Sequence, residues 1–327
     1  MAVRSAPLVR VIRSGLEESI HLGDVAVCDA AGRLVASVGD PDRLVFVRSC
    51  TKPVQAAVAV DAIGLELSDR LVAIISASHN GEPVHLRAVR DVLRRGGLTE
   101  ADLQTPPDRP LDAASARRVR EPRPVYHNCS GKHAGMLLAS TRAGRPTATY
   151  RRRSHPLQRR ILRAVKLLSG SDDVIVGIDG CGVPVHGIGL RAVATMYARL
   201  SDPGGQGPLA PAVDRVVTAM RAEPYLVGGR NRIDTEIMRA TSDVLAKEGA
   251  EALNCAAAFG AGLGIAVKVA DGGYRAAGPA LLSVLDQLGL LGPGARRRLA
   301  RRVSPPVLGG GRPIGRLEPV VRLRRPR

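Results

Sequence analysis

The sequence predicts an α+β fold, in which an antiparallel sheet is flanked by helices, formed by a single domain over residues 1–327. Three observations lead to this prediction. Strand-like segments stand near both ends of the chain, helical segments fill most of the region between them, and no linker marks a convincing domain boundary. Because a sheet must bury its apolar face against other elements, we expect the strands of both ends to pair in one sheet with helices around it.

The first predicted elements are short strands within residues 8–48. Residues 25–28 and 34–38 are apolar runs that flank a turn, and residues 45–47 form a third short strand. Residues 53–60 follow as a buried helix, because a proline stands in its first turn and the run after it is apolar.

The middle of the chain is predicted to be mainly helical. Residues 71–75 form a short apolar run whose pattern leaves helix and strand both open. Residues 103–125 are rich in Pro, Asp and Arg and are expected to form a loop. Helices are expected at residues 84–96, 132–141, 156–168, 189–200, 209–222 and 233–248.

Further strands are predicted toward the C-terminus. They are expected at residues 174–178 (buried), 254–259, 264–269 and 274–277. A helix at 279–289 follows the last of them. The basic tail at 303–327 is rich in Pro, Gly and Arg, and we expect it to be partly mobile.

The composition narrows the class of protein. An apolar content of 45% in 327 residues suits a globular chain with a large core. No run of 18 uncharged apolar residues occurs, so no transmembrane helix is expected, and residues 1–13 lack the apolar segment of a secretory signal. The five cysteines are odd in number and widely spaced, which favours a reducing, cytoplasmic location.

The net charge of +18 allows two interpretations. One is a protein that binds nucleic acid or another anionic surface. The other is a bias of composition, which we favour because the basic residues are spread along the whole chain. The absence of Trp and the presence of only two Phe leave almost no stacking platform for single strands. We therefore expect neither a nucleic-acid partner nor a membrane partner.

Lysine is rare in this arginine-rich chain. Of 48 basic residues, only five are lysines: Lys52, Lys132, Lys166, Lys247 and Lys268. A desolvated lysine can accept a proton, whereas an arginine cannot. The lysines are therefore candidates for chemistry that arginine cannot perform.

The first candidate motif is Ser49-Cys50-Thr51-Lys52. A serine and a lysine three residues apart at a helix start lie on one face, so that the amine can take the serine proton if its pKa is lowered. The same spacing also suits a capping serine beside a solvated lysine.

A second candidate segment runs from Ala77 to Glu82. Ser78 would face the same cleft at the end of an apolar element, and Asn80 and Glu82 could bind the polar ends of a small substrate. The alternative is that Ser78 or Asn80 caps the following helix.

Two cysteine-containing segments form a third candidate. Cys129 lies one helical turn before Lys132 and His133, and Cys181 stands in a bend rich in glycine. Two thiolates that converge could hold Zn²⁺, although free buried cysteines are the simpler explanation. A fourth candidate is Lys268 at the end of an apolar strand, either as a buried base or substrate clamp or as an edge-strand lysine that reaches solvent.

Taken together, these segments resemble the rhizobial-type (class 3) L-asparaginase family. The resemblance spans roughly residues 10–320, and its matching stretches are Arg48–Pro53, Ala77–His79, Asn128–His133, Asp179–Pro184, Gly264–Lys268 and Gly229-Arg230 with Thr235 and Met238. The family is similar in fold to serine β-lactamases and bacterial glutaminases, so the resemblance implies that fold here.

The resemblance also implies roles for individual residues. Two Ser/Lys pairs would form the active site, with a zinc site nearby and a homodimer as the assembly. The implied residues are Ser49 with Lys52 and Ser78 with Lys268 for catalysis, Cys129, Lys132 and Cys181 for zinc, and Arg48, Asp179 and His133 for the substrate or the metal surroundings.

The expected function is hydrolysis of L-asparagine to L-aspartate and ammonia. Ser49, deprotonated through Lys52, would attack the amide, and Ser78 with Lys268 would pass a proton to the leaving ammonia; which serine is the nucleophile stays open. One alternative keeps the Ser/Lys chemistry but acts on a β-lactam or a peptide. A second alternative is a nucleic-acid-binding protein without catalysis.

Overall fold

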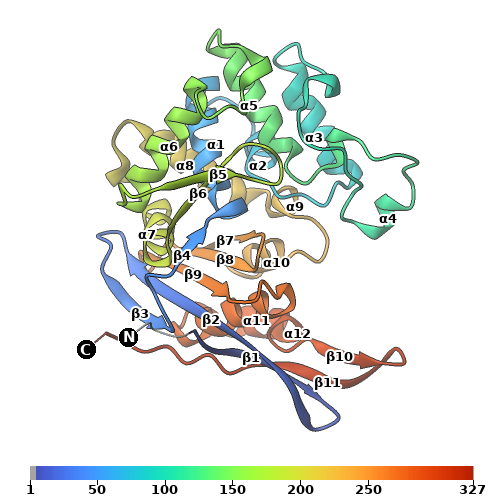
Figure 1. The fold of residues 1–327 in the computed structure, drawn as a ribbon, viewed down its shortest axis with the longest axis vertical. Helices are drawn as coiled ribbons and strands as arrows, with labels where there is room; N and C mark the ends of the chain where they lie inside the picture. Colours follow the sequence, from blue (N-terminus) through green and yellow to red (C-terminus); the bar gives the residue numbers. More distant parts are fainter. Residues whose placement is uncertain (1–4, 327) are drawn as a thin grey trace.

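The computed structural model describes residues 5–326. Within this range, eight strands form a sheet of order β10-β11-β1-β2-β9-β8-β7, in which β3 also pairs with β2 (Figure 1). All the pairings are antiparallel. The strands are β1 (Ala6–Arg13), β2 (Leu16–Asp29), β3 (Leu34–Val38), β7 (Val244–Gly249), β8 (Leu253–Ala258), β9 (Leu263–Val269), β10 (Pro306–Gly309) and β11 (Arg312–Pro319). The predicted α+β fold, with strands of both chain ends in one sheet, is confirmed.

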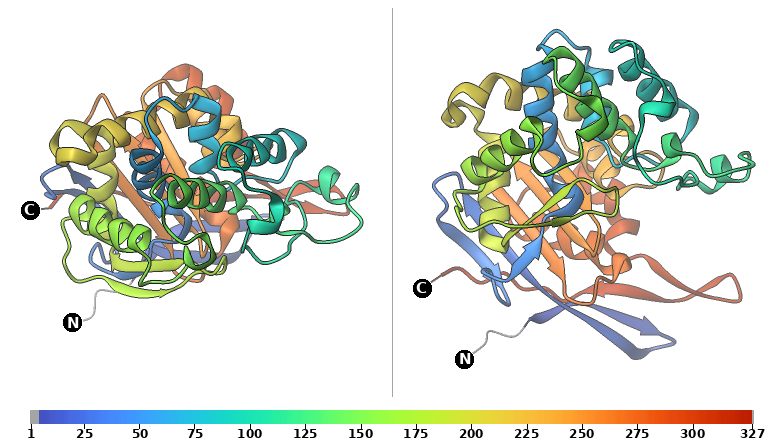
Figure 2. Two further views of the ribbon diagram at one scale, coloured as in Figure 1. Left: turned by 90° about the horizontal axis from the view of Figure 1, so that it is seen from above. Right: turned by 45° about the horizontal axis from the view of Figure 1, so that its top comes forward.

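Helices cover both faces of this sheet, as Figures 1 and 2 show. On one face the core is built from α1 (Lys52–Ile63), α2 (Asp69–Ile75), α3 (Pro83–Arg94), α5 (Ser130–Arg142), α6 (Pro156–Ser169), α7 (Leu190–Ser201) and α8 (Ala210–Ala222). On the other face it is built from α10 (Ile233–Ala240), α11 (Tyr274–Gln287) and α12 (Pro293–Val303).

The central strands are buried on both faces because helices lie on each side. In β8, Leu253, Cys255 and Ala257 belong to the core under α1, whereas Ala256 and Ala258 belong to the core under α11. This alternation follows from the period of two along a strand. Small side chains suit such strands, because helices must approach from both directions.

Gly264 in β9 shows how closely one helix approaches. A Cβ atom built on Gly264 would lie 1.9 Å from the carbonyl oxygen of Ala194 in α7. Only glycine lets the backbone of α7 rest on β9 at this distance.

A second, three-stranded sheet has the order β4-β6-β5. Its strands are β4 (Leu44–Phe46), β5 (Ile175–Ile178) and β6 (Pro184–Gly189). The prediction of a buried strand at 174–178 is wrong in its burial, because Ile175 is 51% and Ile178 is 84% exposed. β5 lies at the edge of this small sheet, which leaves one side of it to solvent.

Three predicted elements differ from the structure. The helix predicted over 233–248 ends at Ala240, and strand β7 follows it. The strand predicted at 274–277 is the first turn of α11, and the tail predicted to be partly mobile forms β10 and β11. Pairing of β11 with β1 and β10 explains the tail. Its prolines are tolerated because Pro313 lies beside an irregularity in the pairing with β10 and Pro319 ends the strand.

Short helices complete the described chain. They are η1 (Arg48–Thr51), η2 (Glu100–Asp102), α4 (Ala113–Ala116), η3 (Pro124–Tyr126), η4 (Thr147–Thr149), η5 (Pro203–Leu209) and α9 (Pro224–Val227). None of the helices between residues 5 and 326 is both long enough and apolar enough to cross a bilayer.

Candidate active site

A pocket of about 670 Å³ lies where η1, the loop after α2 and the end of β7 meet. Most of its lining residues have polar or charged side chains, and both candidate serines are among them. The lining residues are Ser49, Ser78, Asn80, Leu111, Asp112, Ala113, Asn128, Arg230, Asn231, Arg232, Glu248, Ala250 and Tyr274. We call it the substrate pocket below.

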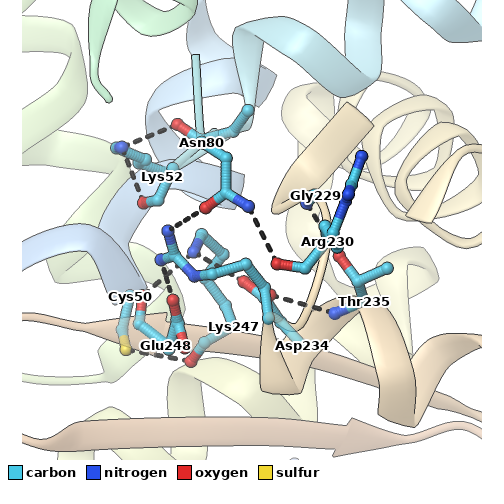
Figure 3. Close-up of polar contacts among 12 residues, drawn as sticks. Cys50, Lys52, Asn80, Gly229, Arg230, Asp234, Thr235, Lys247 and Glu248 are labelled. Carbon is cyan, nitrogen blue, oxygen red and sulfur yellow. Dashed lines mark hydrogen bonds and ion pairs between the residues drawn. The ribbon is translucent and has the colours of Figure 1, made fainter. Parts of the chain in front are cut away.

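Lys52 and Ser78 are in direct contact beside this pocket. Lys52 Nζ donates to Ser78 Oγ at 2.7 Å and to the carbonyl oxygen of Ala77 at 2.6 Å (Figure 3). Both side chains are buried. Burial lowers the pKa of Lys52 to about 8, and the ammonium groups of Lys132 and Lys247 act in the same direction against an opposing effect of Cys129.

The backbone after α2 holds Ser78 in this position. Ser78 N donates to the carbonyl oxygen of Val227, and Asn80 N donates to that of Gly228, both at 2.9 Å. The segment therefore runs alongside the chain after α9, in the manner of a short extended ladder. This pairing turns Ser78 toward Lys52.

Ser49 lies in η1, directly before α1, and lines the substrate pocket. Its predecessor Arg48 has φ of 49°, a left-handed conformation that is strained for a residue with a side chain. Among residues 5–326, no hydrogen bond joins Ser49 Oγ to Lys52. The structure thus brings Ser49 and Lys52 to one pocket but gives the lysine contact to Ser78.

Lys268 is not brought to Ser78. Its Nζ donates to the carbonyl oxygens of Glu251 and Val269 at the end of β9, and it is absent from the pocket lining. The structure therefore does not bring together the Ser78/Lys268 pair that the sequence predicts, and the catalytic role of Lys268 stays a prediction. Alternation along β9 puts Lys268 on the same face as Ala266, but its amine binds these backbone oxygens at the end of the strand.

Lys247 is the second lysine near the site. It is fully buried in β7, and its Nζ donates to Asp234 Oδ2 at 3.0 Å and to the carbonyl oxygen of Glu248 at 2.9 Å (Figure 3). The thiol of Cys50 donates to the carbonyl oxygen of Lys247, which links β7 to η1. The sequence analysis names Lys247 as one of five lysines. It does not place Lys247 at the site, because it predicts a helix over 233–248 where the structure has strand β7.

The two predicted metal-site cysteines come together with Lys132. Lys132 Nζ donates to Cys181 Sγ at 3.0 Å, and Cys129 and Cys181 are close enough for each to shift the pKa of the other. All three side chains are at most 4% exposed. The interaction between the two thiols lowers the pKa of Cys129 well below its usual value and raises that of Cys181. Burial lowers the pKa of Lys132, but the charges of the two sulfurs outweigh it and raise this pKa.

Gly131 makes this convergence possible. A Cβ atom there would lie 2.1 Å from the carbonyl oxygen of Ile74. The start of α5 therefore rests directly against the end of α2, which places Cys129 and Lys132 behind the Ser78 segment.

The chemistry of this cluster suits a zinc ion. Zinc binds thiolate sulfur and neutral nitrogen, and two sulfurs and one amine converge here. Replacing the proton of Cys181 and the extra proton of Lys132 by one divalent cation would leave the total charge unchanged. Among residues 5–326, no group of three or more His, Cys, Asp or Glu side chains could hold a metal ion, and this cluster contributes two cysteines with Lys132 as the third side chain.

Arg48 and Asp179 form an ion pair next to the cysteine cluster. Arg48 Nε donates to Asp179 Oδ1 at 2.7 Å, and the same oxygen accepts from Gly180 N at 2.9 Å. The thiol of Cys181 lies 3.7 Å from the other carboxylate oxygen. Neither Arg48 nor Asp179 is among the residues that line the substrate pocket.

The two remaining predicted residues differ in their outcome. Asn80 lines the pocket, where its Oδ1 accepts from Arg232 at 3.1 Å and its Nδ2 donates to the carbonyl oxygen of Arg230 at 2.9 Å. His133 is fully buried and shares a hydrogen bond of 2.7 Å with the hydroxyl of Tyr150. The structure does not bring His133 to the pocket.

Charged side chains that sequence reasoning missed form much of the wall. Arg232 pairs with Glu248, and Glu82 accepts from Arg230 N at 2.9 Å and from the hydroxyl of Tyr225 at 2.5 Å. Glu82, which the sequence analysis names for a polar contact, lies behind the lining residues, whereas no pattern in the sequence indicates Arg232 and Glu248. Their pairing depends on the strand β7, which was predicted as helix.

Comparison with known proteins gives one family and several distant structures. A model of the family described as L-asparaginase II matches residues 9–319. A β-lactamase from Mycobacterium bovis is similar at 15% identity with a TM-score of 0.44, over 81% of this chain and 94% of that one. A structure titled Mglu is similar at 14% identity with a TM-score of 0.38, over 82% of this chain and 67% of that one. No curated protein matches the sequence.

Proposed function

The chain belongs to the L-asparaginase II family, and from this premise we propose that it hydrolyses L-asparagine to L-aspartate and ammonia with a Ser/Lys centre. The observation that carries the proposal is the buried contact between Lys52 Nζ and Ser78 Oγ at 2.7 Å, beside a pocket that also contains Ser49. A serine next to an amine that can accept its proton is the arrangement that nucleophilic catalysis needs.

The proposed reaction uses the two serines in different roles. Ser49 attacks the side-chain amide carbon, and its proton passes through Ser78 Oγ to the amine of Lys52. Return of this proton to the leaving nitrogen releases ammonia, and water then cleaves the acyl-enzyme to give L-aspartate. The geometry supports Ser78 as the relay because its hydroxyl, and not that of Ser49, contacts the lysine.

Lys247 replaces Lys268 in this proposal. Its ammonium is held by Asp234 without contact to solvent, and it lies on the strand that Cys50 joins to η1. A fixed positive charge there would favour negative charge that develops near Ser49. Arg48 and Asp179 remain proposed contacts for the amino-acid end of the substrate.

We also propose that Cys129, Lys132 and Cys181 hold Zn²⁺. A bound zinc ion supplies a fixed positive charge and ties α5 to the bend at Cys181. Gly131 places the start of α5 against the end of α2, which Ser78 follows. Side chains that fix the start of α5 therefore also help to position the segment that carries Ser78. The homodimer that the family resemblance implies is likewise a proposal, tested by the mass of the purified protein in solution.

The decisive experiment measures ammonia release from L-asparagine, L-glutamine and, by a chromogenic assay, hydrolysis of a β-lactam. We expect asparagine to be turned over and the β-lactam to be left intact. Turnover of the β-lactam alone would contradict the proposal in favour of a β-lactamase-like hydrolase. Tight, salt-dependent DNA binding without any amidase activity would contradict it in favour of a non-catalytic protein.

A further inference from the structure

A second pocket, of about 560 Å³, lies next to the substrate pocket, and the two are separated by the end of β7. The two share Arg232, Glu248, Asn231 and Tyr274 in their walls. The proposed reaction makes no use of the second pocket. We call it the outer pocket.

The two pockets lie on different faces of the sheet. In β8, Cys255 faces the core under α1, and Cys255 pairs with Lys247 across the strands. Asn254 and its partner Glu248 therefore point to the opposite face, toward α11. Asn254 belongs to the outer pocket alone, and Glu248 stands at the boundary between the two.

Asn254 carries an unsatisfied acceptor at the wall of the outer pocket. The side chain is 1% exposed, and its Oδ1 is buried without a hydrogen-bond partner. A buried amide oxygen without a partner is costly, so such groups in native proteins call for an explanation. A ligand with an N–H or O–H donor would supply the missing partner.

The charge of the lining favours an anion. Arg13, Arg232, Arg275 and Arg302 stand against a single carboxylate, that of Glu248. Arg13 and Arg302 have carboxylate partners outside the pocket, but no ion pair within residues 5–326 neutralises Arg275. Arg275 donates to His21 Nε2 and Ser19 Oγ, and His21 in turn contacts the carboxylate of Asp271 at 2.8 Å. Since Arg275 itself contacts no carboxylate among residues 5–326, its charge is available to a ligand carboxylate.

One side of the outer pocket is apolar. Pro279, Val307 and Leu317 line it and are buried, and Ile233 lines it as a partly buried residue. An apolar wall of this kind favours an aliphatic group of a few carbons, whose burial adds to affinity without directional contacts.

We propose that the outer pocket binds a free L-α-amino acid with a branched aliphatic side chain. Arg275 takes the carboxylate, the ammonium donates to Asn254 Oδ1 and faces the carboxylate of Glu248, and the side chain lies on the apolar wall. The ligand class follows from the three kinds of group that the pocket presents together. Binding there does not depend on the asparaginase reaction, so it can be tested apart from it.

The test is calorimetric titration of the full chain with L-leucine. We expect saturable binding of one leucine per chain. Leucinamide, which lacks the carboxylate, and 4-methylpentanoate, which lacks the ammonium, should each bind at least about tenfold more weakly, the effect of one lost charged hydrogen bond. These two analogues test the assignment on the unaltered protein.

Variants locate the site. Asn254→Leu and Arg275→Gln should each weaken leucine binding at least about tenfold while unfolding at temperatures close to that of the parent protein. Ser78→Ala, which alters only the substrate pocket, should leave leucine binding unchanged. No binding up to about 10 mM leucine, or binding that Ser78→Ala removes and the two outer-pocket variants keep, would overturn the proposal. If either variant unfolds, the analogue series on the parent protein decides.

Discussion

Lys52 is the side chain that connects the parts of the candidate active site. It donates to Ser78 and Ala77, follows Ser49 by one turn, and is affected by the charges of Cys129, Lys132 and Lys247. The proposed role requires a side chain that is cationic after it accepts the serine proton and neutral before. An arginine could fill the first requirement but not the second.

Replacing Lys52 by arginine should therefore lower kcat for asparagine by at least about 10³, as expected for loss of a residue in the nucleophilic machinery. Ser49→Ala and Ser78→Ala should cause losses of the same order. Lys166→Arg is the matched control, because the side chain of Lys166 is 37% exposed and its ion pair with Asp172 is 3.7 Å long. Full activity of Lys52→Arg would reject Lys52 as the proton acceptor.

The assignment of Lys247 in place of Lys268 makes a separate prediction. Lys268→Arg should keep ammonia release within about threefold of the parent, because Lys268 contacts only backbone oxygens away from the pocket. Lys247→Met should abolish ammonia release. This variant should also lose about 3 kcal/mol of stability, since it leaves Asp234 buried without its partner.

The double variant Lys247→Met/Asp234→Leu separates the two effects on Lys247. Removing both charges should restore much of the stability but none of the activity. Thermal unfolding and ammonia release, measured on the same samples, give both quantities. A stable double variant with parent-like activity would show that Lys247 is only structural.

The metal content of the protein tests the proposed zinc site of Cys129, Lys132 and Cys181. Elemental analysis of the purified protein should find about one zinc per chain, and Cys129→Ala or Cys181→Ala should remove it. Cys28→Ala is the control, because Cys28 is buried under α7 with its thiol directed to the carbonyl oxygen of Arg191. Zinc retained by Cys181→Ala would place the metal elsewhere.

The residues that could be predicted are those whose chemistry is local. Ser49 and Lys52 are close in the chain, and the pair Cys129 and Lys132 is one helical turn long, so their spacing carries information. The ion pair of Arg232 with Glu248 could not be predicted, because it depends on how α10 and β7 are joined. The lysine that contacts Ser78 could not be predicted for the same reason, because residue spacing does not report contacts between distant parts of the chain.

At the scale of elements, the helix predicted over 233–248 is the most instructive difference. Residues 244–247 are two apolar side chains, an alanine and a lysine, which suit a helix as well as a strand. The strand wins because β8 offers a partner and both faces are buried. Tertiary pairing thus overrides a weak local preference.

The contact of α7 with β9 makes a prediction at this scale. Gly264→Ala should destabilise the protein by about 3 kcal/mol, because its Cβ would meet the backbone of α7 and neither element can move freely. Gly294→Ala is the matched control, since Gly294 is exposed near the start of α12 with no heavy atom within 4 Å of a Cβ. That variant should be neutral or more stable by about 0.5 kcal/mol.

Thermal unfolding of the two glycine variants provides the measurement. The melting temperature should fall for Gly264→Ala and stay level or rise for Gly294→Ala. Equal melting temperatures for both variants would mean that α7 is free to shift over the sheet. The close approach of α7 to β9 would then have no role in positioning η1 and α1, which lie on the same face of the sheet as α7.

At the scale of the whole molecule, the two ends of the chain close one sheet. β1 pairs with β2 on one side and with β11 on the other, so residues about 300 positions apart in the sequence are neighbours. The general arrangement could be predicted because strands near both termini need partners. The inclusion of the tail as β10 and β11 could not, because its Pro and Gly content is also typical of a mobile segment.

Buried histidines give the whole molecule a pH dependence. Burial lowers the pKa of His186 to about 4, with Lys132 acting in the same direction, and lowers the pKa of His85 as well. In the unfolded chain such side chains take up a proton near pH 6.5. Between about pH 6.5 and pH 4 the unfolded state therefore binds more protons than the folded state, so acid favours unfolding.

The free energy of unfolding should thus be highest above about pH 6.5 and should fall as the pH decreases toward 4, with His186 alone accounting for about 3 kcal/mol. The charge of +18, which grows as carboxylates are protonated, adds self-repulsion in the same direction. Urea unfolding at several pH values measures the slope. His186→Gln removes one of the titrating groups without adding charge, so its curve should be flatter by that amount; an unchanged slope would mean that His186 is protonated in the folded protein or that other groups set the acid sensitivity.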